Sequence, residues 1–225
     1  MGIYDRIRPL VTGGLDLSPA YAFPWSGTDD VIVDVGCGTG DALDYLEGYR
    51  EYHGFDPDAR AIDHLRRRRP RPGVHVYDRE LGRADIERIR PTAALLVGVF
   101  HHLSDQQVLE VLDVLGTGGH VRGIRTLDVR KRRGDLVNNA FVAFDRGKYV
   151  RSAEALEALI SRSPFRVADR FSFSPRIKIV SYLVLALEPQ RQNKAEPQMS
   201  TDEHGSEGAD AGSTGAGGGR IRTQE

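Results

Sequence analysis

The sequence contains a single cysteine, Cys37, and it has no long apolar run and no excess of either charge. One cysteine excludes an internal disulfide and argues against a cysteine-based zinc site. No apolar run approaches the about 20 residues that a membrane span requires. The early charges in MGIYDRIRPLV argue against a secretory signal peptide. We therefore expect a cytoplasmic protein with no membrane partner.

The charges nearly cancel, with 31 Lys and Arg against 32 Asp and Glu. Because the chain has no overall positive field, a nucleic-acid partner is not expected. Arginines at 66–69 and 71 do form a basic run at the end of a helix predicted over 57–69. No aromatic residues alternate with these arginines to stack bases, so we interpret them as solvated cations that suit the helix dipole. Nucleic-acid binding through 66–71 is the alternative.

The chain has 225 residues, of which 40% are hydrophobic. This is enough for one α/β domain with a substantial core, which we place at 1–189. Residues 190–225 are rich in Gly, Ser and Glu, contain no aromatic residue and have few apolar ones. Such a segment cannot bury enough surface to offset the entropy of ordering, so it is predicted to be a disordered tail.

The most informative stretch is 31–41, VIVDVGCGTGD. Its first five residues are mostly β-branched, as in a strand buried on both faces. Three glycines then predict a sharp turn, and 41–50 reads as a helix. A strand, a glycine turn and a helix in this order typically form a binding site for a nucleotide-like ligand.

The spacing of the glycines distinguishes between two nucleotide ligands. A dinucleotide fingerprint requires a third small residue at position 41, which is Asp41, an acid that would face a pyrophosphate. The spacing present is D-x-G-x-G-x-G, and it resembles motif I of class I S-adenosylmethionine (SAM) dependent methyltransferases. SAM carries an ammonium and a sulfonium, so nearby acids are favourable. The resemblance implies that SAM is the cofactor and that it contacts Asp34, Gly36, Cys37, Gly38 and Gly40.

A second acid lies where the resemblance requires one. Asp56 follows the short strand EYHGF, twenty positions after Gly36, and Pro57 comes next. An acid at the end of the second strand can accept hydrogen bonds from both ribose hydroxyls. The plain alternatives are that Asp34 caps a helix or braces the loop, and that Asp56 forms a turn before Pro57.

The segment 93–107, AALLVGVFHHLSDQQ, is predicted to be a central strand followed by a helix capped by Ser104 or Asp105. It resembles motif IV of small-molecule methyltransferases. Val99 is then a cofactor contact, and His102 or His101 is the catalytic base, with His102 slightly preferred. The alternative is that one histidine packs under the cofactor and the other braces a loop. No carboxylate motif accompanies the pair, so no metal site is predicted.

The remaining segments complete the expected domain. Asp78, after a strand at 74–78, is a candidate contact to the adenine, and Asp128 ends a strand at 120–129 at the same edge of the sheet. An inserted amphipathic helix is expected near 134–146, followed by antiparallel strands at 165–173 and 181–189. The cations Arg146, Lys148 and Arg151 are candidates to hold an anionic substrate, or to form a loop paired with Asp145 and Asp128. The N-terminal segment contributes a cap, whose aromatic residues are lid candidates or core plugs: Tyr4, Tyr21 and Trp25.

The predicted fold class is α/β, a doubly wound, mostly parallel seven-stranded sheet of the Rossmann-like class I methyltransferase type. The predicted function is SAM-dependent methyl transfer to oxygen or nitrogen of a small molecule. A sugar, or an intermediate of cell-surface or secondary metabolism, is the suggested acceptor, by analogy with bacterial relatives. Two alternatives stay open: an RNA or protein methyltransferase that uses Arg66–Arg71, and a non-catalytic subunit that binds a partner.

Overall fold

The computed structural model describes residue 21 and residues 29–68, 70–130, 148–173 and 181–190. All of these belong to the compact unit Met1–Arg191. The predicted inserted helix near 134–146, most of the N-terminal cap and nearly all of the predicted tail lie outside the described residues. No helix in the described part of the chain has the length and apolarity to cross a membrane.

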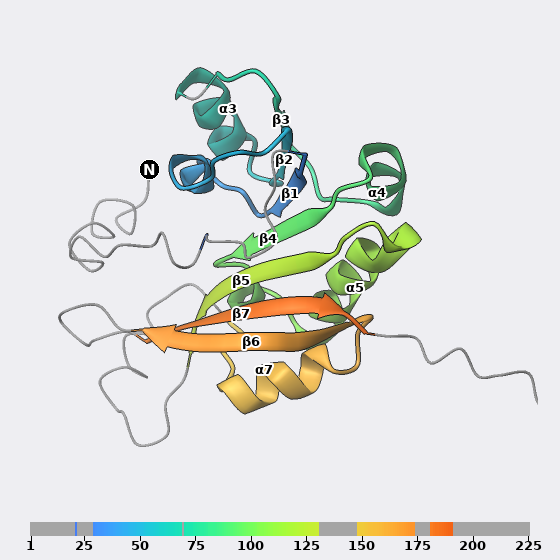
Figure 1. Cartoon of the computed structure of the whole chain (residues 1–225). Coiled ribbons are helices and arrows are strands. Elements are labelled where there is room, and N and C mark those ends of the chain that lie inside the picture. The colour runs from blue at the N-terminus through green and yellow to red at the C-terminus, as the bar shows by residue number, and fades with distance from the viewer. Residues whose placement is uncertain (1–20, 22–28, 69, 131–147, 174–180, 191–225) are drawn as a thin grey trace, which may run out of the picture. The chain divides into compact units, whose positions relative to one another are not determined.

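Seven strands form one sheet in the order β3-β2-β1-β4-β5-β7-β6 (Figure 1). Strands β1 to β5 are parallel to one another, and β7 pairs antiparallel with both β5 and β6. This confirms the predicted doubly wound, mostly parallel sheet. The strands are β1 Val31–Val35, β2 Glu51–Phe55, β3 Val74–Tyr77, β4 Ala93–Val97, β5 Gly123–Val129, β6 Phe165–Phe173 and β7 Tyr182–Pro189.

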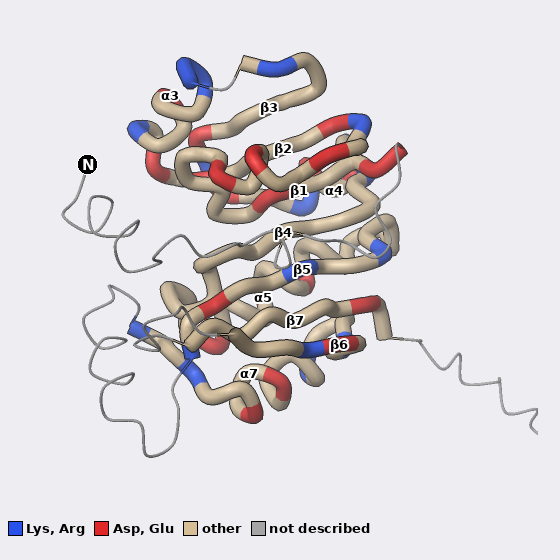
Figure 2. The backbone as a smooth tube through the Cα atoms, turned by 60° about the vertical axis from the view of Figure 1, so that its left-hand side comes forward, with Lys and Arg blue, Asp and Glu red and all other residues tan. Residues whose placement is uncertain are grey.

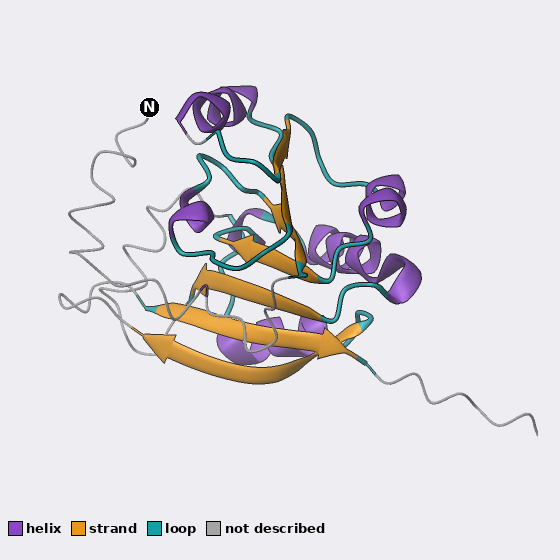
Figure 3. Cartoon of the chain, turned by 45° about the horizontal axis from the view of Figure 1, so that its top comes forward, coloured by secondary structure: helices purple, strands orange, loops and turns teal. Residues whose placement is uncertain are grey.

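Helices cover both faces of the sheet (Figure 3). One face packs against α4, α5 and α7, and the other packs against α3 and η1. The core therefore has two halves, one on each face of the sheet. In β1, Val33 packs on the α4, α5 and α7 side and Ile32 on the α3 and η1 side, and both are at most 2% exposed. The helices are η1 Asp41–Asp44, α3 Ala59–Arg68, α4 Arg83–Ile89, η2 Phe100–His102, α5 Asp105–Gly116, η3 Thr117–Gly119 and α7 Ala153–Ile160.

Two local predictions can be compared with these elements. The helix predicted over 41–50 is wrong, because only the single 3-10 turn η1 forms and Gly48 then takes a left-handed conformation with φ 71°. The buried residues of this segment, Ala42, Leu43 and Leu46, supply an apolar surface only about one turn long. The predicted cap of α5 is confirmed, since the Ser104 hydroxyl accepts the Gln107 N–H at 3.3 Å.

Candidate active site

The site lies beyond the carboxyl ends of the parallel strands β1, β2, β4 and β5. The N–H groups of Gly36 and Cys37 donate to the carbonyl of Phe55, at 2.7 and 3.2 Å, which fastens the glycine turn to the end of β2. The Gly98 N–H donates to the carbonyl of Leu127 at 2.7 Å, which joins the ends of β4 and β5. Ligands of open α/β sheets bind at such strand ends.

The glycine turn has a supported side and an open side. Gly40 has φ 78°, and a Cβ built there would overlap the side chain of Leu65 in α3. A Cβ on Gly36 would lie 2.8 Å from Val99 Cγ2, so Val99 supports the turn from below. A Cβ on Gly38 would meet nothing within 4 Å. The turn therefore presents bare backbone to open space, which suits a ligand that lies directly against it.

Asp56 faces this turn from the end of β2. Its Oδ2 accepts the Gly38 N–H at 2.9 Å, and its Oδ1 accepts the Asp58 N–H at 2.8 Å. Each carboxylate oxygen has two lone pairs, so both oxygens can accept a further bond from a ligand hydroxyl. Pro57 is exposed beside it.

Asp34 and Cys37 lie beneath the turn. Asp34 is 2% exposed, and its Oδ2 accepts the hydroxyl of Tyr52 at 2.6 Å. Burial raises the pKa of Asp34 to about 7, although the bond from Tyr52 opposes the shift. Cys37 is buried against Gly54, and burial raises the pKa of its thiol. In this geometry Asp34 links β1 to Tyr52 on β2, and Cys37 is a packed, protonated side chain.

His101 forms a buried pair with Asp128 that the sequence did not predict. The two atoms His101 Nδ1 and Asp128 Oδ1 are 2.7 Å apart, and the two residues are 7% and 3% exposed. The same Oδ1 accepts the His101 N–H at 3.2 Å, while Asp128 Oδ2 has no hydrogen-bond partner among the described residues. Burial raises the pKa of Asp128. His102 is exposed, with its ring centroid 4.0 Å from that of His101.

Arg151 holds the histidine segment in place. It donates to Asp105 Oδ1 at 2.6 and 2.8 Å, to the carbonyl of Phe100 at 2.8 Å and to that of Leu103 at 2.7 Å. Arg151 therefore forms a paired loop, but its acidic partner is Asp105 and not the expected Asp128, which is bound to His101. The expected partner Asp145 lies outside the described residues. Lys148 is exposed, and Arg146 lies outside the described residues as well.

The other candidates are divided between surface and core. Asp78 is exposed after β3. Tyr21 is 5% exposed and stacks on Tyr45 with ring centroids 4.8 Å apart, which is the core-plug alternative. Tyr4 and Trp25 lie outside the described residues.

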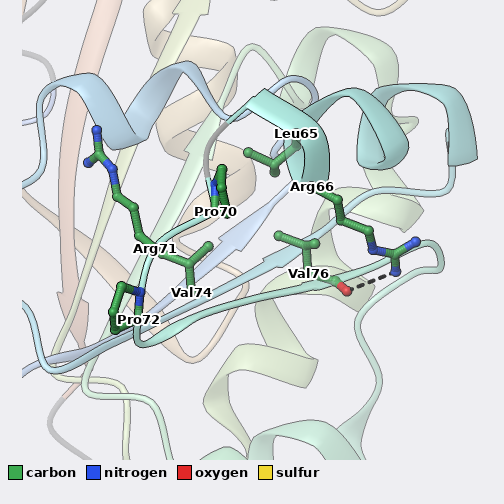
Figure 4. Close-up of a pocket in the computed structure, with 7 residues that line it drawn as sticks. All are labelled: Leu65, Arg66, Pro70, Arg71, Pro72, Val74 and Val76. Carbon is green, nitrogen blue, oxygen red and sulfur yellow. Dashed lines mark hydrogen bonds between the residues drawn. The ribbon is translucent and has the colours of Figure 1, made fainter.

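The basic run is at the end of α3, where Figure 2 shows Lys and Arg gathered. Two of its arginines are bound within the chain. Arg66 donates to the carbonyl of Val76 at 3.2 Å, and Arg71 donates to the carbonyl of Leu43 at 2.9 Å. Figure 4 shows both beside a surface pocket with an apolar floor that includes Leu65 and Val74. Neither arginine therefore projects freely toward a nucleic-acid backbone.

The comparisons with known proteins agree with this geometry. Residues 33–121 match a family model described as a methyltransferase domain. These residues, fewer than half of the chain, match a class I SAM-dependent methyltransferase domain, as the resemblance of the motifs implied. The predicted family, the prediction of an enzyme and the predicted cofactor SAM are thereby confirmed. No curated protein sequence matches the chain.

Solved methyltransferase structures share the fold. Geranyl diphosphate C-methyltransferase from Streptomyces coelicolor A3(2) matches with 14% identity and a TM-score of 0.59, over 83% of this chain and 82% of that one. A methyltransferase of calicheamicin biosynthesis in its SAH-bound form matches with 17% identity and a TM-score of 0.62, over 83% of this chain and 56% of that one. The mitomycin 7-O-methyltransferase matches with 18% identity and a TM-score of 0.58, over 81% and 54%. The matched part of this chain thus spans just over half the length of the last two enzymes.

Proposed function

We propose that this methyltransferase transfers the methyl group of SAM to an oxygen or nitrogen of a small molecule. The buried pair of His101 and Asp128, placed at the same sheet edge as the glycine turn, carries the proposal. Structural relatives include enzymes named for O-methylation and for C-methylation of small molecules. A histidine oriented by a carboxylate favours the acceptors that lose a proton, namely hydroxyls and amines.

The residues around the turn fit the proposed cofactor. Gly36, Gly38 and Gly40 would hold the methionine end, since a Cβ on Gly38 would point into open space. Asp56 would accept bonds from the ribose hydroxyls through its remaining lone pairs. Cys37, Pro57, Asp78 and Val99 remain proposed cofactor contacts. Asp34 would favour the ammonium in its ionised form, because the two charges are opposite. When bound, SAM supplies a methyl group on a sulfonium, which is open to in-line displacement.

His101 is the proposed general base. With Nδ1–H donating to Asp128, the basic lone pair is on Nε2, and this atom would take the proton of the acceptor hydroxyl or amine. The resulting imidazolium is stabilised by the Asp128 carboxylate 2.7 Å away. Asp128 is a positioning residue, because it is buried beneath His101 and holds the Nδ1 side of its ring. His102 is the second candidate base.

The proposed domain organisation extends this site. We propose that 1–189 is one methyltransferase domain, that its N-terminal segment and a helix near 134–146 cover the acceptor, and that 190–225 is a disordered tail. An acidic or phosphorylated acceptor would find Lys148 exposed near the site. Arg151 forms an ion pair with Asp105, so it is not proposed to bind the acceptor.

An acceptor screen with methyl-labelled SAM tests the function. Hydroxylated aromatics, amines and sugars are incubated with the full-length protein, and transfer is then compared among variants. General-base catalysis contributes about 10²- to 10⁴-fold, so His101→Gln should lower kcat by about 100-fold or more at an unchanged Kd for SAH. Asp128→Asn should move the acidic limb of the pH profile to lower pH, because the imidazolium loses its anion. His120→Gln, at the opposite sheet edge, is the control. Full turnover by His101→Gln together with loss in His102→Gln would transfer the role to His102.

A further inference from the structure

Three potential metal ligands meet on β2 and β3, away from the proposed active site. Glu51 and His53 are two positions apart on β2, so their side chains are on the same face of the strand. His75 is the direct partner of His53 in the parallel pairing of β2 with β3. One ligand atom from each of the three residues lies within 4.8 Å of the others.

The geometry of the cluster approaches that of a coordination site. Glu51 Oε2 and His53 Nε2 are 3.0 Å apart, and the rings of His53 and His75 are stacked with centroids 4.8 Å apart. Ligand atoms of a tetrahedral zinc ion are separated by about 3.3 Å, given metal–ligand distances of about 2.0–2.1 Å. His53 is 4% exposed and fixed, whereas His75 is exposed on the edge strand. A small rotation of the His75 imidazole would therefore close the site.

Tyr77 supplies a partner for the second ring nitrogen of the buried histidine. The hydroxyl of Tyr77 lies 3.3 Å from His53 Nδ1. Metal-binding histidines usually donate their other N–H to such a group, which fixes the tautomer. A hydroxyl can donate or accept, so Tyr77 can serve His53 both with Nε2 bonded to Glu51 and with Nε2 bonded to a metal.

The charges of the cluster suit a cation. Glu51 supplies a carboxylate oxygen, and His53 and His75 supply imidazole nitrogens. Two cations lie nearby, and each has an acidic partner: Arg50 is 3.8 Å from Glu51 Oε1, and Arg88 is 3.2 Å from Asp85 Oδ1. The Oε2 atom of Glu51, on the His53 side, remains directed at the cluster.

We propose that Glu51, His53 and His75 bind a divalent transition-metal ion, with Zn²⁺ as the best match. Two imidazoles and one carboxylate form a borderline ligand set, which favours zinc, cobalt or nickel over magnesium or calcium. Because His75 is exposed, a water molecule completes the coordination. The ion would cross-link the edge strand β3 to β2. His53 precedes Asp56 by three residues, about 10 Å along the chain, so the site is structural and independent of methyl transfer.

The test is calorimetric titration of EDTA-treated, full-length protein with ZnCl₂, with cobalt absorption as a second readout. The expected result is one tight equivalent of zinc, a higher Tm with zinc, and the visible d–d bands of a four-coordinate cobalt ion. His75→Gln, at an exposed position that tolerates exchange, should abolish the tight equivalent. Tyr77→Phe keeps the ring and should weaken zinc binding by about 10-fold or more, since loss of such a partner typically costs about 10–100-fold.

His64→Gln on α3 is the matched control, because it removes one histidine outside the cluster. It should bind zinc as the unaltered protein does. The proposal is overturned if no tight equivalent binds, or if His75→Gln retains it. A loss in both His75→Gln and His64→Gln would equally overturn it, because binding would then not depend on this cluster.

Discussion

Replacing Asp56 with alanine is the most informative single change in the proposed cofactor site. The carboxylate lies at the end of β2 and already accepts the Gly38 and Asp58 N–H groups. A hydrogen bond to a charged group contributes about 1.5–3 kcal/mol. Loss of the proposed ribose contact should therefore raise the Kd for SAH by about 10- to 160-fold. Asp56→Asn keeps one acceptor oxygen, so its Kd for SAH should lie between those of Asp56→Ala and the unaltered protein.

Calorimetric titration with SAH measures these affinities, and urea unfolding separates them from stability. Part of the alanine effect is structural, because the half-buried Gly38 N–H loses its acceptor. Asp58→Ala removes an exposed acid two residues away and should leave the Kd for SAH unchanged. Equal SAH binding by Asp56→Ala and the unaltered protein would refute the ribose contact. Equal losses in both variants would show a general charge effect instead.

Three further predictions concern the support of the site. Gly40→Ala should destabilise the fold by about 2–4 kcal/mol in urea unfolding, because a left-handed residue would overlap Leu65; an unchanged midpoint would contradict this. The pKa of Asp34 is about 7 in the folded protein against an ordinary 3.8, so its contribution to the free energy of unfolding is present at low pH and is lost as pH rises from about 4 to 7. Asp34→Asn should flatten the pH dependence of the free energy of unfolding over that window. An unaltered slope would contradict the raised pKa of this carboxyl. Arg151→Gln should lower both stability and turnover by loosening the segment that holds His101, measured by urea unfolding and initial rates, and unaffected rates would refute the coupling.

Much of the fold could be predicted because it depends on local composition. The β-branched run at 31–35, the apolar run at 93–97 and the cap at Ser104 each encode their element within a few residues. The doubly wound, mostly parallel seven-stranded sheet follows from the family resemblance and is confirmed. The positions of the glycine turn and Asp56 follow as well, since both are at the ends of such strands.

What could not be predicted depends on contacts between distant segments. His101 and Asp128 are 27 residues apart in the sequence, and they meet only because β4 and β5 pair side by side. The cluster on β2 and β3 depends on the register that places His53 opposite His75, which no local pattern determines. The predicted helix over 41–50 was wrong because helical spacing of apolar residues persists for about one turn only, and Gly48 then turns the chain away.

The central claim is that the edge formed by the glycine turn and Asp56 binds SAM. Its most direct test is calorimetric titration of the full-length protein with SAH, with NAD as the control ligand. We predict saturable, micromolar binding of SAH at one site and no binding of NAD. Binding of neither ligand, or binding of NAD alone, would contradict the account.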